Sequence, residues 1–369
     1  MKLLHIADLH LGKKLDQYFI LEEQQENLRQ VTDYIIQEHV DVLLISGDIF
    51  DKKNPKGQAI DVYRQFIETI TQYCEVYAIA GNHDNFYFHQ FASSLLSKSH
   101  YHVIGQLDHE IVQLEWKKNN EKLVLSLCPY MDLPMLREVL CDESIQEENE
   151  GMEKLLSYVE VDEQAINVLL YHGYVTGKQE LIFSDSERIN TLGTSQAVDV
   201  NLFSKFDYVA LGHLHRYQQV EDSNCYYSGS LYWYSESELH HEKGMIEITW
   251  TGNQKEVTFI PFQPSHRVRK ISGSCEELLQ MPETEDYIYA EVIGRDRPLK
   301  FHQQLKERCP HLIQISQIQE EENFLLKDQH FDFDNSIEEQ IKQYYELIYD
   351  EPMTQEEENI LHELMKESD

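Results

Sequence analysis

The stretch VDVLLISGDIFD, residues 40–51, combines a short apolar run with an acidic motif at its end. A run of this length that stops at a glycine is typical of a buried strand. The same order recurs near the N-terminus, where the apolar run Lys2–Ala7 leads directly into Asp8. Between the two runs, apolar side chains recur at helical spacing at Leu28, Val31 and Ile35. The sequence therefore predicts strand–helix–strand order in this part of the chain.

The alternation continues further along the chain. Helical spacing returns over Gln58–Gln72, and further strands are predicted at Glu75–Ala80, Leu123–Cys128, Ile166–Tyr171 and Tyr208–Leu211. Strands that alternate with helices indicate a layered α/β core.

Five short polar motifs follow these apolar runs. They are DLHLG at 8–12, GDIFD at 47–51, GNHD at 81–84, YHG at 171–173 and GHLH at 212–215. In α/β sheets, ligands gather at the carboxyl ends of the strands. We therefore expect the five motifs to converge, although they are far apart in the sequence.

The motifs offer oxygen and nitrogen donors without a thiolate, a set that suits Mn, Fe or Zn. Residues two apart on a strand share a side, so Asp8 is expected to lie with His10, and His213 with His215. The two carboxylate oxygens of Asp48 can bridge two metals. Glycines beside these residues let the backbone turn sharply and approach closely. Two divalent ions would activate a water and clamp the oxygens of an in-line phosphoryl displacement.

The composition constrains the partners of the chain. It has 369 residues, with 31 Lys+Arg against 66 Asp+Glu, which gives a net charge of −35. This charge repels nucleic acid, so a nucleic-acid enzyme would need bound cations or a basic partner. Composition alone favours a small-molecule enzyme or an acidic interaction protein.

The cysteines and the apolar runs bear on the compartment. Six scattered cysteines without a CxxC pair fit a reduced, cytoplasmic protein and argue against a disulfide framework or a thiolate zinc site. No apolar run reaches the ~18 residues of a membrane span, so we expect no membrane association.

The character of the sequence changes near Pro261–Pro264, where a basic cluster and a compact segment with a predicted strand and helix follow. We therefore predict domains at 1–265, 266–332 and 333–369. The last segment reads as two short helices with apolar stripes. The pattern alone does not decide whether the stripes pack on the parent domain or on a partner protein. The basic cluster at 267–270 is interpreted as ordinary surface.

In order and composition the five motifs resemble those of the calcineurin-like metallophosphoesterase family. The resemblance implies an α/β fold in which a β-sandwich is flanked by helices, with a small α+β capping domain and a C-terminal helical tail. Within the family it is closest to bacterial nuclease subunits that work with an SMC-like ATPase. It extends to segments 206–215, 227–230, 234–238 and 262–279.

The resemblance also implies roles for single residues. Two divalent metal ions, expected to be Mn²⁺, would be held by seven side chains: Asp8, His10 and His215 on one ion, Asn82, His172 and His213 on the other, and Asp48 between them. His83 would lie beside the scissile phosphate and stabilise the transition state or protonate the leaving oxygen. Asp84 would hydrogen-bond the His83 ring and fix its tautomer.

The implied activity is that of a two-metal DNA phosphodiesterase, a 3′→5′ exonuclease and single-strand endonuclease. It would process DNA ends and hairpins with the SMC-like ATPase in DNA repair, recombination and replication. The chain contains no GxxxxGK[ST] motif, so ATP hydrolysis would come from that partner. A homodimer within a heterotetramer is implied as well. Tyr232 or Trp233 could stack on a base.

Two alternatives stay open. The first is a small-molecule or phosphoprotein phosphoesterase of the same family, which Asp84 and the Asp51-Lys52-Lys53 run disfavour. The second is a non-catalytic scaffold for an ATPase, which has no need of seven intact ligands.

Overall fold

The computed structural model describes residues 1–90, 99–119, 121–179, 181–185, 187, 197–252, 254–294 and 298–318, with isolated positions beyond 340. Its contacts group Met1–Ile318 into one compact unit and Gln319–Asp369 into a second. The two helices predicted between 336 and 369 lie almost wholly outside the described residues, so that prediction stays open.

Two six-stranded sheets form the centre of the first unit. The first sheet has the order β16-β15-β1-β4-β5-β6. Its strands are β16 (Gln254–Pro261), β15 (Gly244–Thr251), β1 (Lys2–Ile6), β4 (Val42–Ser46), β5 (Glu75–Ile79) and β6 (Tyr101–Ile104). Strands β1, β4, β5 and β6 run parallel, whereas β15 pairs antiparallel with β1 and β16.

The second sheet has the order β13-β14-β12-β9-β8-β7. Its strands are β13 (Gln218–Gln219), β14 (Cys225–Tyr227), β12 (Tyr208–Gly212), β9 (Ile166–His172), β8 (Glu121–Cys128) and β7 (Val112–Lys118). The four central strands, β14, β12, β9 and β8, are parallel. Two short pairs accompany the sheets: β2 (Lys14–Leu15) with β3 (Tyr18–Phe19), and β10 (Val175–Thr176) with β11 (Val198–Asp199).

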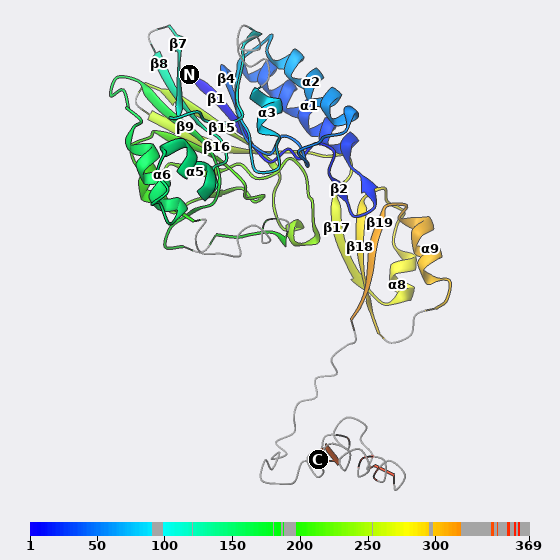
Figure 1. Ribbon diagram of the computed structural model, residues 1–369. Coiled ribbons are helices and arrows are strands. Elements are labelled where there is room, and N and C mark those ends of the chain that lie inside the picture. Colours follow the sequence, from blue (N-terminus) through cyan, green and yellow to red (C-terminus); the bar gives the residue numbers. More distant parts are fainter. Residues whose placement is uncertain are drawn as a thin grey trace. The chain divides into compact units, whose positions relative to one another are not determined.

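Helices cover the outer faces of both sheets (Figure 1). The first sheet is covered by α1 (Leu21–Glu38) and α2 (Gly57–Ile70), with the short α3 (Phe86–Gln90) nearby. The second is covered by α5 (Leu133–Leu140), α6 (Glu148–Ser157) and the 3₁₀ turn η3 (Val200–Phe203). A second 3₁₀ turn, η4, spans Glu236–Glu238. The expected β-sandwich flanked by helices is confirmed.

Strand alternation explains why the sheets stack in this way. Leu3 and Leu44 point between the two sheets, where they meet Leu170 of β9 in one buried cluster. Leu4 and Leu43, one position along, point to the helix-covered face. Because every second side chain of these apolar runs is buried on each face, both faces of the central strands must be covered.

A third sheet lies between residues 268 and 318. Strands β17 (Val268–Gly273), β18 (Tyr287–Ile293) and β19 (Leu312–Ile318) are parallel, and α8 (Cys275–Gln280) and α9 (Phe301–Arg308) connect them. Ser274 begins α8 with a capping box that it forms with Glu277. A hydrophobic cluster of its own, which includes Ile288 and Phe301, fills this part. The proposed boundary near residue 265 stays a prediction.

Among the described residues, no helix has the length and apolar character needed to cross a membrane. The six cysteines are free thiols, and five of them are wholly or partly buried.

Candidate metal centre

The five polar motifs meet at one edge of the sandwich. Three follow β1, β4 and β5 of the first sheet, and two lie at the ends of β9 and β12 of the second. Within each sheet these strands are parallel, so their carboxyl ends lie together. The hydroxyl of Ser46 donates to the carbonyl of Ala210 at 2.9 Å and joins the two edges. The convergence expected from the sequence is therefore present.

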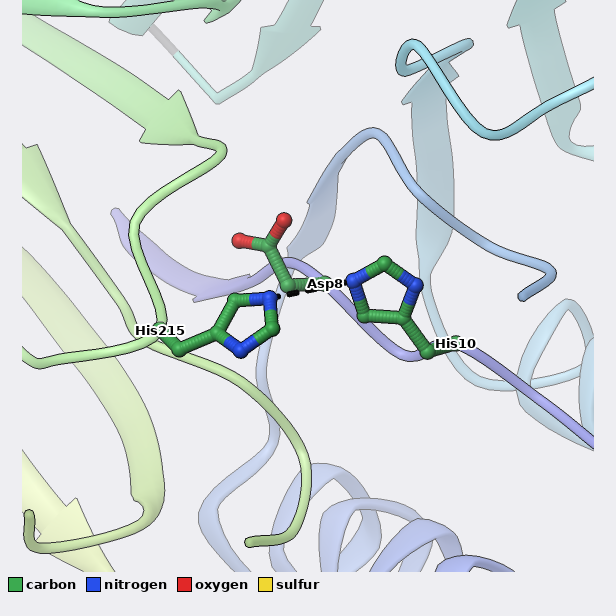
Figure 2. Close-up of side chains that lie close together, drawn as sticks. All are labelled: Asp8, His10 and His215. Atoms are coloured by element: carbon green, nitrogen blue, oxygen red, sulfur yellow. Dashed lines mark hydrogen bonds between the residues drawn. The ribbon is translucent and has the colours of Figure 1, made fainter. Parts of the chain in front are cut away.

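Asp8, His10 and His215 form one cluster (Figure 2). The Nε2 atoms of His10 and His215 lie 3.1 Å apart. A carboxylate oxygen of Asp8 lies within 4.8 Å of ligand atoms of both rings. All three side chains are buried. The Asp8 carboxylate also accepts the backbone N–H of His213, with both oxygens at 3.0 Å.

Asp48 lies between this cluster and His172. Its Oδ2 is 3.6 Å from Nε2 of His10 and 3.6 Å from Nε2 of His172. The same His172 nitrogen lies 3.1 Å from Oδ1 of Asn82. The His172 and His213 ring centroids are 5.6 Å apart. The seven side chains predicted as ligands thus form one contiguous set.

Four of these residues have left-handed backbone conformations. Their φ angles are 51° at Asp8, 43° at His10, 49° at Asp48 and 112° at His213. Such angles are uncommon outside glycine and gather at functional sites. Strand β1 ends at Ile6, before Asp8, and β12 ends at Gly212, before His213. Asp8 and His10 lie together as expected. The reason differs from the prediction, because tight turns after the strands, and not strand alternation, direct these side chains and those of His213 and His215.

Glycines at positions 47 and 81 are required by close packing. A Cβ at Gly81 would lie 2.2 Å from Oδ1 of Asp48. At Gly47, where φ is +89°, a Cβ would lie 2.3 Å from Nδ1 of His172. A side chain at either position would displace one of the predicted ligands, as the sequence indicated.

Hydrogen bonds fix the tautomers of two histidines. Nδ1 of His172 donates to the carbonyl of Ser46 at 2.8 Å, and Nδ1 of His215 donates to Oε1 of Glu238 at 2.9 Å. Carbonyl and carboxylate oxygens can only accept, so the proton stays on Nδ1 in both rings. Nε2 then keeps its lone pair, which is the state in which a histidine binds a metal.

Burial sets the charges of the cluster. It lowers the pKa of His172 to about 4 and holds the pKa of His10 and of His213 well below the ordinary value. It raises the pKa of Asp48 to about 7. Burial and the neighbouring Asp48 together raise the pKa of Asp8 well above its usual range. Neutral imidazoles packed against buried carboxylates are a donor set that divalent cations fit.

His83 lies beside this set, with its ring centroid 4.9 Å from that of His10. Its backbone N–H donates to Oδ1 of Asp48 at 2.8 Å, and its Nδ1 donates to the carbonyl of Asp51 at 2.9 Å. The predicted hydrogen bond between Asp84 and the His83 ring was wrong. The Asp51 carbonyl holds the ring instead, and it leaves Nε2 as the atom that can take up a second proton.

Asp84 joins two of the motifs. Its carboxylate is fully buried and accepts the backbone N–H groups of Ile49 at 3.1 Å, Phe50 at 3.0 Å and Gly81 at 2.9 Å. Nε2 of His89 lies 3.4 Å away. Burial alone would raise the pKa of Asp84, but His89 and these N–H groups hold it below the usual range. The Asp84 carboxylate therefore binds backbone N–H groups of two turns, and not the His83 ring as the family resemblance implied.

Sequence reasoning missed the residues that surround His215. Glu187 accepts the His215 backbone N–H, and Glu238 receives the ring proton. Lys243 donates to Glu238 at 2.6 Å and to the His215 carbonyl at 2.9 Å. All three charged side chains are buried. The only signal in the sequence is that segment 234–238, which contains Glu238, resembles the family. Nothing in the sequence indicates that a charged residue will be buried.

The structure also bears on two further predictions, that Tyr232 or Trp233 stacks on a base and that the basic cluster at 267–270 is ordinary surface. Tyr232 is fully buried and donates to the carbonyl of His266 at 2.6 Å, so its ring is not available to a base. Trp233 donates to the carbonyl of His241 at 3.0 Å. In the basic cluster, Arg269 pairs with Asp286, and Lys270 pairs with two glutamates, as ordinary surface residues do.

Residues 1–217 match the model of the family described as calcineurin-like phosphoesterase. The chain belongs to this family. Members of a calcineurin-like phosphoesterase family are expected to share the two-sheet core, and the resemblance inferred from the five motifs is confirmed.

Within the calcineurin-like phosphoesterases, two relatives extend the similarity beyond residue 217. The D subunit of the SbcCD nuclease of Staphylococcus saprophyticus is 31% identical over 346 residues, which cover 91% of this chain and 87% of the relative. The protein of the same name from Staphylococcus epidermidis is 28% identical over 327 residues, or 86% of each chain. Among solved structures, a dimetal phosphatase from Danio rerio is 14% identical, with a TM-score of 0.40 over 71% of this chain and 96% of its own.

Proposed function

We propose that this chain is a two-metal DNA phosphodiesterase, the SbcD-type nuclease subunit that processes DNA ends and hairpins with an SbcC-type SMC-like ATPase. The observation that carries the proposal is the position of Asp48. Its Oδ2 lies at 3.6 Å from Nε2 of both His10 and His172, which belong to different predicted ligand sets. The name of the two relatives, which places them in the SbcCD nuclease, supports the substrate and the partner.

The contacts support the proposed ligand roles. Asp8, His10 and His215 would hold one ion, since their donor atoms lie within 4.8 Å of one another. Asn82, His172 and His213 would hold the second, with Asp48 between the two. Divalent ions bound there would supply positive charge to the phosphate and lower the pKa of the attacking water. We propose Mn²⁺ as the ion that supports activity in assays.

His83 acts on the phosphate in this scheme. The Asp51 carbonyl orients its ring through Nδ1, and its backbone N–H holds Oδ1 of Asp48. A protonated Nε2 would donate to the oxygen that develops charge or leaves. Lys13, which lines the same pocket, pairs with Asp51 at 3.2 Å and brings an ammonium group close to the phosphate. Together these groups favour a phosphate ester, whose oxygens accept hydrogen bonds and whose charge is negative.

The remaining segments have proposed roles too. Residues 266–332, which contain β17 to β19, would form the capping domain, and residues 333–369 would dock on the ATPase. The chain would pair with a second copy inside a heterotetramer. These roles fit the two helices predicted between 336 and 369 and a sequence without the GxxxxGK[ST] motif.

The test is a nuclease assay of the purified chain on end-labelled single- and double-stranded DNA in Mn²⁺, Mg²⁺ or EDTA. Asp48→Asn and His83→Ala are the site variants. Lys306→Ala, an exposed substitution on α9, is the matched control. We expect Mn²⁺-dependent cleavage that both site variants reduce at least 100-fold and the control leaves unchanged.

Other results would point elsewhere. Full activity in both site variants would refute the two-metal mechanism. Faster turnover of cyclic nucleotides or phosphopeptides than of DNA would favour a small-molecule or phosphoprotein phosphoesterase. Tight binding to an SbcC-type ATPase without cleavage in any metal, even with ATP, would favour the scaffold.

A further inference from the structure

Two buried polar side chains from distant parts of the chain meet at the turn that carries Asp8 and His10. Gln24 belongs to α1, and Tyr234 lies two residues before the 3₁₀ turn η4. Gln24 is fully buried, Tyr234 is 6% exposed, and the amide nitrogen of Gln24 donates to the Tyr234 hydroxyl at 3.0 Å. Burying polar groups costs free energy unless they are hydrogen-bonded, so the partners of this Gln24–Tyr234 pair indicate its role.

The Gln24–Tyr234 pair holds the backbone of the first metal motif. The Tyr234 hydroxyl donates to the carbonyl of Leu9 at 2.6 Å. The amide nitrogen of Gln24 lies 3.0 Å from the carbonyl of Leu9 and 2.8 Å from that of His10. The amide oxygen of Gln24 accepts the backbone N–H of Gly12 at 3.1 Å. His10 has a φ angle of 43°, a left-handed conformation that persists only when its surroundings fix it, and these bonds do so.

The ring of Tyr234 packs against the imidazoles of two predicted ligands. Its centroid lies 5.4 Å from that of His10, with the ring planes at 86°, and 5.6 Å from that of His215, with the planes at 76°. Aromatic rings prefer such edge-to-face contacts, which restrict how each ring can turn. The two imidazoles point their Nε2 atoms toward one another at 3.1 Å, beside Asp8 (Figure 2). One side chain thus contacts two of the three residues assigned to the first ion.

His10 depends on packing more than two of its fellow ligands do. Nδ1 of His172 and Nδ1 of His215 each donate to an oxygen, which fixes those rings. Nδ1 of His10 is buried and has no hydrogen-bond partner among the described residues. The ring of His10 is therefore oriented by the rings against it, those of Tyr234, His83 and His215. Tyr234 is the one of these three that binds neither an ion nor the phosphate in the proposed scheme.

We propose that Tyr234, held by Gln24, is a positioning residue for the first ion, the one assigned to Asp8, His10 and His215. The inference rests on the proposed two-metal function and adds what prepares one of the two sites. The hydroxyl of Tyr234 fixes the turn that carries two of the ligands, and its ring fixes two imidazoles. Since these contacts go to the ligands of the first ion, the second ion should bind without them.

The test separates the hydroxyl from the ring. Tyr234→Phe removes the hydroxyl, Tyr234→Leu removes the ring as well, and Gln24→Met removes the amide that holds both. The matched control is Tyr232→Phe. Tyr232 is fully buried two residues away and donates to the carbonyl of His266 at 2.6 Å, a bond of the same kind outside the metal cluster.

Four measurements are made on the full chain. Calorimetric titration with Mn²⁺ gives the affinity of each binding step, and electron paramagnetic resonance distinguishes a coupled pair of Mn²⁺ ions from isolated ions. Hydrolysis of bis(p-nitrophenyl) phosphate is followed as a function of Mn²⁺ concentration. Urea unfolding in EDTA reports stability without metal.

We expect Tyr234→Phe to weaken one Mn²⁺-binding step about tenfold and Tyr234→Leu about 100-fold, as the loss of groups that orient metal ligands does. The other step should keep its wild-type affinity. At a Mn²⁺ concentration that fills both wild-type sites, Tyr234→Leu should show the resonance of isolated ions. Gln24→Met should resemble Tyr234→Phe, and the double variant should lose less than the sum of the two, since they share a hydrogen bond.

Activity should depend on metal in the same way. Half-maximal hydrolysis should need about tenfold more Mn²⁺ in Tyr234→Phe, while kcat at saturating Mn²⁺ stays at the wild-type value. Tyr232→Phe should lower the urea midpoint as much as Tyr234→Phe does and bind both ions like the wild type. A purely structural role for Tyr234 would make these two variants alike in every measurement.

Three results would overturn the inference. They are wild-type Mn²⁺ affinity in both Tyr234 variants, an equal loss at both binding steps, and an equal loss of Mn²⁺ affinity in Tyr232→Phe. Because Tyr234→Phe keeps the ring and the volume of the side chain, it decides the outcome even if Tyr234→Leu fails to fold. Failure of the proposed function alone reads differently: the wild-type chain would bind two ions, and the variants would lose one, but no DNA would be cleaved.

Discussion

Replacing Asp84 by asparagine is a sharp test of the structure. A carboxylate that joins two turns and a carboxylate that orients the His83 ring predict different results. The structure makes Asp84 a clamp between two turns, with three backbone N–H groups on its carboxylate. An asparagine oxygen can keep the pair from Ile49 and Gly81, which share Oδ2 in the wild type. Its amide group would then face the N–H of Phe50 and the ring of His89.

The magnitude follows from these contacts. Asp84→Asn loses the negative charge and leaves the Phe50 N–H buried without an acceptor. Hydrogen bonds to charged groups are worth about 1.5–3 kcal/mol, and a stranded buried donor costs about 1–3 kcal/mol. We expect the free energy of unfolding to fall by about 2–4 kcal/mol. Because the turn that carries Asp48 is loosened, Mn²⁺ affinity should fall about 10- to 100-fold.

The measurements are urea unfolding in EDTA, followed by tryptophan fluorescence, and calorimetric titration with Mn²⁺. Asp132→Asn is the control, since Asp132 accepts one backbone N–H, that of Met135, at the start of α5. It should cost about 1 kcal/mol or less and leave Mn²⁺ binding unchanged. If Asp84→Asn kept wild-type stability and metal affinity but shifted the pH profile of kcat, the clamp would be wrong and Asp84 would act on His83.

Three further predictions follow from single contacts. Gly81→Ala should abolish Mn²⁺ binding in the same titration, since its Cβ would lie 2.2 Å from Oδ1 of Asp48, whereas Gly57→Ala, with no atom within 4 Å, should bind normally. Lys243→Met should cost about 3–5 kcal/mol in urea unfolding by leaving Glu238 buried beside His215 without its cation, and adding Glu238→Gln should recover part of that loss. Burial lowers the pKa of His5 to about 3, so the unfolded chain takes up a proton below pH 6.5 that the folded chain does not. Stability should therefore fall by about 2 kcal/mol between pH 7.5 and pH 5.0 through this group, and His5→Phe should remove that part of the dependence; an unchanged dependence would refute it.

The local signals in the sequence predicted the strands and helices of the α/β core well. The strand expected at Lys2–Ala7 is found at Lys2–Ile6, and the helix expected over Gln58–Gln72 is found at Gly57–Ile70. These elements are readable because their apolar periodicity reflects burial on one or both faces. The convergence of the five motifs was also predictable, since parallel strands end at a common edge.

Tertiary structure decided the details of the site. The ligand side chains are directed by left-handed turns after the strands, such as those at Asp8 and His213, and not by strand alternation. His83 is oriented by a carbonyl, which every residue carries and no motif can reveal. The charges around His215 come from Glu187, Glu238 and Lys243, whose burial depends on packing between segments distant in the sequence.

The sequence by itself determined the order of strands and helices, the family and the set of donor side chains. It could do so because strand and helix periods and ligand chemistry are properties of short segments. Only the tertiary structure decided which acceptor holds which donor. Backbone N–H groups of the turns around Asp48 and Gly81 both donate to the Asp84 carboxylate, and this arrangement exists only once the two turns are brought together.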